Sequence, residues 1–170
     1  MTMQRGSPAV LGIDIGGVII DRVNDDTDTS FFGDNYLKTT AVPGAFEAIK
    51  SLVDRRFQGH AYVVSKCGKN VERKTREWLA HHDFYRRTGL HEDDFHFCRK
   101  RHEKAPICAR LGITHFVDDR LEVLSYLETV PHKYLFRPDE AEVTRFSGYL
   151  NRVIRVQSWD ETVNHALRDD

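Results

Sequence analysis

Four sets of reactive side chains follow apolar or helical segments at intervals along the sequence. They are Asp14, Ser65, Lys104 and the adjacent pair Asp118-Asp119. A carboxylate can attack phosphorus or bind a metal ion, and a hydroxyl can donate to phosphoryl oxygens. Carboxylates that face one another repel unless a cation lies between them, and their hard oxygen atoms suit magnesium. These residue types predict a site that holds a phosphoryl group beside a divalent cation.

The elements that position these residues are expected to form one parallel sheet. Apolar runs with strand character alternate with segments of helical periodicity, which is typical of a parallel sheet covered by helices on both faces. The expected strands are 8–13, 61–64, 95–98, 113–117, 133–136 and 152–156, and the expected helices are 43–53, 70–82, 100–111, 121–130 and 159–167. Ligands bind at the carboxyl ends of such strands. The sequence therefore predicts a three-layer, Rossmann-like α/β fold with Asp14, Ser65 and Asp118-Asp119 at one sheet edge.

Composition narrows the class of protein. The 170 residues suffice for one well-packed domain, and the 25 basic and 26 acidic residues give a net charge of -1. That balance gives no strong signal for nucleic acid or for an anionic membrane. No apolar run is long enough to span a bilayer, and the N-terminus lacks the form of a signal peptide. Three scattered cysteines (Cys67, Cys98 and Cys108) fit reduced thiols, so we expect a cytoplasmic protein.

The ordered set of motifs resembles that of the haloacid dehalogenase (HAD) superfamily from about residue 9 to 135. The matching stretches are Leu11-Gly12-Ile13-Asp14-Ile15-Gly16-Gly17-Val18, Val63-Val64-Ser65, Glu103-Lys104-Ala105-Pro106 and Phe116-Val117-Asp118-Asp119-Arg120. The resemblance implies a HAD-like hydrolase, a magnesium-dependent phosphatase that works through an aspartyl-phosphate intermediate. Asp14 would be the nucleophile, and Lys104 would neutralise the phosphoryl group. Ser65 and Lys66 would bind the phosphate. Mg2+ would be bound by Asp14, the Gly16 carbonyl, Asp118 and Asp119.

One position departs from the family pattern. Most phosphatases of the superfamily carry a second acid two residues after the nucleophile, where this chain has Gly16. The backbone carbonyl survives this change, but the proton donor to the leaving oxygen does not. Such general acid–base help is worth roughly a hundred- to ten-thousand-fold in rate, most of all for alkyl esters. The alternative function is therefore a catalytically impaired HAD-fold module that binds a phosphorylated ligand or a protein partner.

Acids of the following loop could replace the missing proton donor. Asp21, Asp25, Asp26 and Asp28 have the pattern of ordinary solvated loop residues, and one of them could reach back over the site.

The spacing of the motifs also bears on the cap that many HAD enzymes insert. Between Asp14 and Pro43 there is room for a flap at about 21–42, and between Ser65 and Lys104 only for helix, loop and strand. We therefore expect one HAD-like domain over residues 1–170 without a full cap. An open site suits a large phosphorylated substrate, or closure by another subunit of an oligomer.

Each residue also has a simpler interpretation. Ser65 could cap the helix that follows it, and Asp118-Asp119 could cap the helix near Leu121. Lys104 lies in a basic run from Arg99, which is typical of a solvated helix face. Cys67 has the pattern of a small buried thiol.

Overall fold

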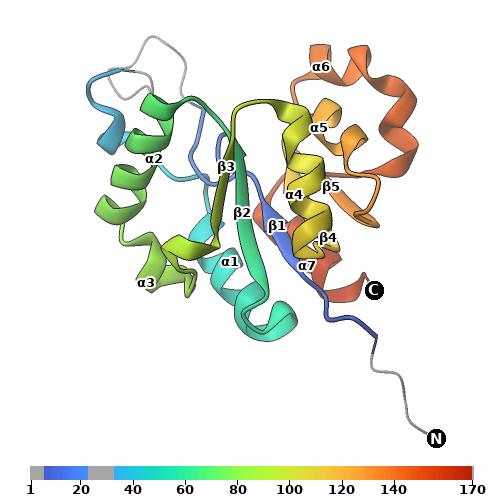
Figure 1. Cartoon of the computed structure of the whole chain (residues 1–170), viewed down its shortest axis with the longest axis horizontal. Coiled ribbons are helices and arrows are strands. Elements are labelled where there is room, and N and C mark those ends of the chain that lie inside the picture. The colour runs from blue at the N-terminus through green and yellow to red at the C-terminus, as the bar shows by residue number, and fades with distance from the viewer. Residues whose placement is uncertain (1–5, 23–32, 170) are drawn as a thin grey trace, which may run out of the picture.

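The computed structural model describes residues 6–22 and 33–169. Six strands form one sheet in the order β3-β2-β1-β4-β5-β6, and every neighbouring pair is parallel (Figure 1). The strands are β1 (Leu11–Ile13), β2 (Ala61–Lys66), β3 (Phe95–Cys98), β4 (His115–Asp118), β5 (His132–Phe136) and β6 (Ile154–Val156). The predicted Rossmann-like α/β fold is confirmed.

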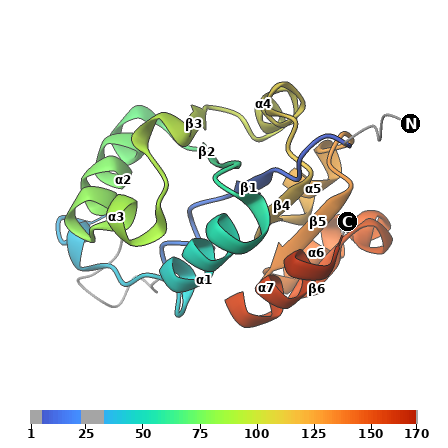
Figure 2. The same ribbon diagram turned by 90° about the horizontal axis from the view of Figure 1, so that it is seen from below.

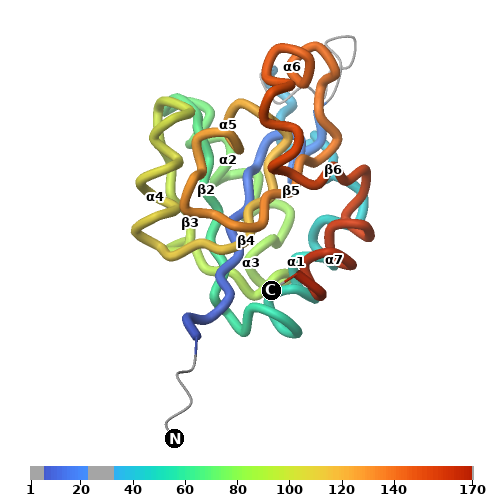
Figure 3. Tube along the Cα trace, turned by 90° about the vertical axis from the view of Figure 1, so that its right-hand side faces the viewer, coloured from blue at the N-terminus to red at the C-terminus, as the bar shows by residue number. Residues whose placement is uncertain are grey.

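Helices cover the two faces of this sheet. Seen from below, α1 and α7 lie on one side, and α4 and α5 lie on the other (Figure 2). The helices are α1 (Ala45–Leu52), α2 (Lys69–His81), α3 (Phe84–Thr88), α4 (Lys104–Leu111), α5 (Leu121–Tyr126), α6 (Glu140–Arg145) and α7 (Trp159–Arg168). The C-terminal end lies beside α1 and α7, at the opposite end of the molecule from α6 (Figure 3). Among the described residues, no helix has both the length and the apolar character needed to cross a membrane.

The side chains of the central strands form a hydrophobic core on each face of the sheet. Consecutive strand side chains point to opposite faces. Val63 and Val117 therefore enter the core beneath α1 and α7, whereas their neighbours Val64 and Phe116 enter the core beneath α4 and α5. All four side chains are fully buried. Because the central strands are apolar on both faces, they read in the sequence as continuous hydrophobic runs.

The Phe116 ring fills the space beside Gly12 at the junction of the two central strands. Gly12 of β1 pairs with Phe116 of β4, and a Cβ atom on Gly12 would lie 2.5 Å from the Phe116 ring. The chain leaves β1 toward β2 on one side and leaves β4 toward β5 on the other. This is the topological switch point of the sheet, where open α/β proteins form their ligand crevice. Asp14 lies at this point, and its backbone N–H donates to the Val117 carbonyl at 3.0 Å.

Some local features differ from the sequence predictions. The helices α3 and α6 were not predicted, and α5 ends at Tyr126 rather than at residue 130. In α2 the buried positions are Thr75, Trp78 and Leu79, whereas Val71 is only partly buried. The structure describes only the two ends of the flap predicted at 21–42. The C-terminal end contacts α2, where the Trp78 indole N–H donates to the Thr39 carbonyl.

Candidate functional site

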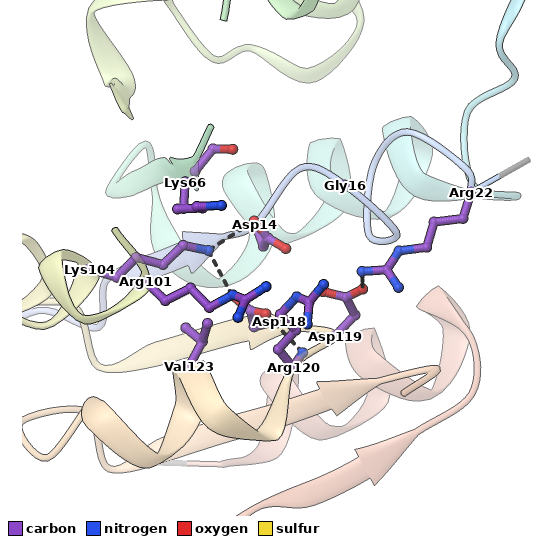
Figure 4. A pocket seen from close by; sticks show the side chains of 11 residues that line it. Asp14, Gly16, Arg22, Lys66, Arg101, Lys104, Asp118, Asp119, Arg120 and Val123 are labelled. Carbon is purple, nitrogen blue, oxygen red and sulfur yellow. Dashed lines mark hydrogen bonds and ion pairs between the residues drawn. The ribbon is translucent and has the colours of Figure 1, made fainter. Parts of the chain in front are cut away.

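A buried lysine joins two of the strand-end carboxylates. Lys104 is the first residue of α4, and its Nζ atom lies 2.9 Å from Asp14 Oδ1 and 2.8 Å from Asp118 Oδ2 (Figure 4). Its side chain is only 2% exposed. Burial alone would lower the pKa of Lys104, but Asp118 and Asp14 outweigh that effect, and the pKa is raised. The interpretation of Lys104 as part of a solvated helix face is therefore wrong.

The third carboxylate completes a compact acidic cluster. Asp14, Asp118 and Asp119 are all buried, and one oxygen atom of each lies within 4.8 Å of the others. Burial raises the pKa of Asp118 and of Asp119, and the charge on Asp14 raises both further. A divalent cation would remove this repulsion, and three carboxylates are the hard oxygen donors that Mg2+ prefers. The residues present therefore fit a magnesium ion, and Gly16 lines the same cavity.

Helix capping does not account for these residues. The N-cap of α2 is Gly68 and not Ser65. At the start of α5, the backbone N–H groups of Leu121 and Glu122 donate to the carboxylate of Glu142, at 2.8 and 2.9 Å. Asp119 takes no part in that cap and instead forms an ion pair with Arg22. Asp118 Oδ1 accepts the Arg120 N–H at 2.9 Å, just before α5, while its other oxygen contacts Lys104. Ser65 therefore caps no helix, and Asp118 contacts the turn before α5 in addition to its contact with Lys104.

Ser65 and Lys66 stand at the end of β2, next to β1. Ser65 is buried and lines the same cavity as the carboxylates. Its hydroxyl has no hydrogen-bond partner within residues 6–22 and 33–169, so it is free to donate to a ligand. The neighbouring thiol of Cys67 is buried, and burial raises its pKa, as expected for a structural cysteine.

One cavity of about 160 Å³ collects every residue that was predicted for the site. They are Asp14, Gly16, Ser65, Lys66, Lys104, Asp118 and Asp119. The cavity is also lined by residues that were not predicted as site residues, namely Arg22, Arg101, Arg120 and Val123. Arg101 carried a weak signal, because it belongs to the basic run before Lys104. Arg22 carried none, since its contact with Asp119 exists only in the folded chain.

The two glycines after Asp14 have different roles. Gly17 has a φ of +78°, and a Cβ atom there would lie 2.6 Å from Asp119 Oδ2. Gly16 lacks a positive φ, and no atom lies within 4 Å of the position its Cβ would take. The turn therefore requires glycine at position 17 but has room for a side chain at position 16.

Of the acids considered as replacements for the missing proton donor, the structure describes Asp21. Asp21 does not line the cavity, and its backbone N–H donates to the Thr40 carbonyl at 2.9 Å. Asp25, Asp26 and Asp28 lie outside the described residues.

Fold and site together define a Rossmann-like α/β protein with a carboxylate-rich cavity at the switch point of its sheet. No family model matches the sequence, and no curated protein matches it. In structure the chain is similar to a haloacid dehalogenase-like hydrolase from Burkholderia xenovorans, with a TM-score of 0.54 at 15% identity. The match covers 75% of this chain and 59% of that one, so this chain spans less than two thirds of its neighbour. At this identity the likeness shows a shared fold.

Proposed function

We propose that this chain is a magnesium-dependent phosphohydrolase of the HAD type that works through an aspartyl phosphate at Asp14. The observation that carries the proposal is the contact of buried Lys104 with both Asp14 and Asp118, beside Asp119, in an open cavity. A cluster of buried charged groups with shifted pKa values beside a cavity is typical of a functional site. The fold shared with a HAD-like hydrolase supports the same reaction class.

The geometry assigns a role to each side chain. The attacking atom is Asp14 Oδ2, because Lys104 holds Oδ1. Its bond to phosphorus forms as the bond from phosphorus to the leaving oxygen breaks, and water later hydrolyses the aspartyl phosphate. The free Ser65 hydroxyl donates to a phosphoryl oxygen, and Lys104 offsets the charge that gathers there. Mg2+ would be held by Asp14, Asp118, Asp119 and the Gly16 carbonyl, and it would supply further neutralisation of the phosphoryl oxygens.

Turnover of 4-nitrophenyl phosphate in the presence of Mg2+ tests this proposal. We expect measurable hydrolysis that stops when the metal is chelated, and an Asp14→Asn rate lower by about ten-thousand-fold or more. Asp54→Asn is the matched control, because Asp54 is an exposed acid two residues after the end of α1 and forms an ion pair with Lys50. Equal rates in Asp14→Asn and the control would refute the aspartyl phosphate.

Gly16 is the observation that favours the second candidate, a module that binds a phosphorylated ligand without turning it over. With no acid at this position, wild-type rates should depend steeply on the pKa of the leaving group, and alkyl phosphates should be poor substrates. Absence of turnover with every phosphate ester, while Mg2+ is bound, would favour the binding module.

Restoring the acid is a direct test of the same position. Since the backbone and the space at Gly16 accept a side chain, Gly16→Asp should leave the fold intact. We expect it to raise hydrolysis of alkyl phosphates by roughly a hundred- to ten-thousand-fold and to change aryl phosphate hydrolysis much less. Wild-type rates that are equal for alkyl and aryl esters would show that another acid already donates the proton, with Asp21 and residues 25–28 the first to examine.

A further inference from the structure

The mouth of the cavity carries more positive charge than the proposed reaction needs. Besides Lys104, four cations line it, namely Arg22, Lys66, Arg101 and Arg120 (Figure 4). Two of these have acidic partners: Arg22 pairs with Asp119, and Arg101 lies 3.3 Å from Glu122. The side chains of Lys66 and Arg120 have neither an ion pair nor a hydrogen bond within the part of the chain that the structure describes.

A count of charges shows an excess of positive charge at the cavity. The five cations that line it face its three carboxylates and Glu122, the partner of Arg101, which leaves a surplus of one positive charge. A bound Mg2+ ion and the dianion of a phosphate monoester cancel each other, so this surplus persists when the site is filled as proposed. Unmatched cations in a concave, low-dielectric site attract further anionic groups.

The positions of these two cations define where such a group would lie. Lys66 ends β2 and Arg120 follows β4, and β1 with Asp14 runs between those two strands. Ile13 pairs with Val63 of β2 and with Val117 of β4. Lys66 and Arg120 therefore each lie one strand to the side of Asp14, about 4.8 Å across, and two residues farther along, toward the rim. Lys66 is exposed and Arg120 is half-buried, which leaves their charged ends accessible at the rim. A second anion would therefore sit a few ångströms outward from the phosphoryl group on Asp14.

The segment between Ser65 and Lys104 places no domain over this rim. It consists of the end of β2, then α2, α3, β3 and two short 3-10 turns. Within residues 6–22 and 33–169, Lys66 and Arg120 are therefore left accessible to a substrate larger than a simple monoester.

We infer that the site selects phosphate esters carrying a second phosphate group, which Lys66 and Arg120 bind at the rim. The inference rests on the proposed function for the position of the first phosphoryl group. Guanidinium and ammonium groups both form charge-assisted hydrogen bonds with phosphate oxygens. The second phosphate can belong to a small bisphosphate or to the next phosphodiester of a nucleic-acid end, and the chemistry recognised is the same.

Calorimetric titration in the presence of Mg2+ tests the inference. The ligands are adenosine 5'-phosphate, adenosine 3',5'-bisphosphate and a 5'-phosphorylated dinucleotide, all alkyl phosphates that the wild type should hydrolyse slowly. We expect the bisphosphate or the dinucleotide to bind about tenfold or more tightly than the monophosphate. Whichever of the two binds more tightly identifies the source of the second phosphate, and equal affinities for all three ligands would overturn the inference.

Variants assign the preference to residues. Lys66→Gln and Arg120→Gln should each reduce the ratio of bisphosphate to monophosphate affinity toward one. Lys69→Gln and Arg145→Gln remove the same charge from exposed positions outside the cavity and should preserve the ratio. If Lys66 and Arg120 instead bind the transferred phosphoryl group, both affinities fall together and the ratio stays constant, which would contradict the inference. Because the titration reports affinity and not rate, this outcome is separate from a failure of the aryl phosphate assay.

Discussion

Strand β4 has a buried polar cluster at each of its ends. The two clusters differ in how far hydrogen-bond partners and opposite charges compensate their polar groups. At the start of β4, each ring nitrogen atom of His115 has a hydrogen-bond partner. Its Nε2 atom donates to the Asp169 carbonyl at 2.8 Å, and its Nδ1 atom lies 2.7 Å from the Thr114 hydroxyl. The Tyr134 hydroxyl donates to the Asp169 carboxylate at 2.9 Å. At its other end, Asp118 and Asp119 share with Asp14 a single buried lysine and the exposed Arg22.

The difference separates a structural cluster from a ligand site. Burial lowers the pKa of His115 to about 4, so the ring is neutral and both its nitrogen atoms have partners. Burial raises the pKa of Asp118 and Asp119, and their charges remain only partly compensated beside a cavity. A polar group that is buried and fully paired stabilises one fold, whereas buried charge left unmatched next to open space points to a ligand.

Removing the lysine should give the largest change in stability. In Lys104→Met, a neutral side chain of similar length leaves Asp14 and Asp118 without their cation. We expect a loss of about 3–5 kcal/mol in the free energy of unfolding of the metal-free protein, measured in urea. Lys69→Met, at an exposed position, should change it by less than about 0.5 kcal/mol. Equal losses in the two variants would show that the carboxylates do not depend on Lys104.

Asp119 should link stability to both metal and pH. In the metal-free protein its pKa rises from 3.8 to about 9 on folding. The folded state then holds the proton more tightly than the unfolded state, so stability should fall as pH rises from about 4 toward 9. Asp119→Asn should flatten this slope. Mg2+ at a hundred times its Kd should stabilise the wild type by about 2.7 kcal/mol and the variant far less, measured by thermal unfolding. A shift of equal size in both proteins would place the metal elsewhere.

His115 should show the opposite pH behaviour with a smaller effect. Its folded pKa is about 4 and its ordinary value is 6.5, so its contribution is present above pH 6.5 and is lost as pH falls toward 4. His115→Gln should cost about 1–2 kcal/mol at neutral pH and remove that acid slope, measured by urea unfolding at several pH values. Mg2+ should stabilise the His115→Gln variant as much as it stabilises the wild type. A reduced metal effect would mean that the two ends of β4 are coupled.

Much of the fold was predictable because its central strands are apolar on both faces. The central strand β2 covers the predicted segment 61–64, and Asp118-Asp119 come directly after the apolar residues of β4. At the edge of the sheet, the predicted segment 95–98 coincides with β3. The helices α3 and α6 were missed because they have five and six residues, fewer than two turns, and so show no helical period.

In the candidate site, too, some residues could be predicted from the sequence and others could not. Lys104 could be selected from its basic run because it is in register with Ile107 and Cys108 on the inner face of a helix. Glu142 could not be recognised as the cap of α5, because it lies 21 residues from Leu121 and meets it only after packing. The contact of Arg22 with Asp119 is likewise a product of the folded chain.

The close pairing of Gly12 with Phe116 has a consequence for the order of folding events. β1 and β4 are neighbours in the sheet although 104 residues separate Val10 from the Thr114 hydroxyl that its backbone N–H contacts. Closing so long a loop is slow, and contacts of this range form late. The acidic cluster is split across that junction, so a chain with only its first half in place has Asp14 but lacks Lys104, Asp118 and Asp119. Metal and phosphate would therefore bind after the rate-limiting step and slow unfolding without accelerating folding.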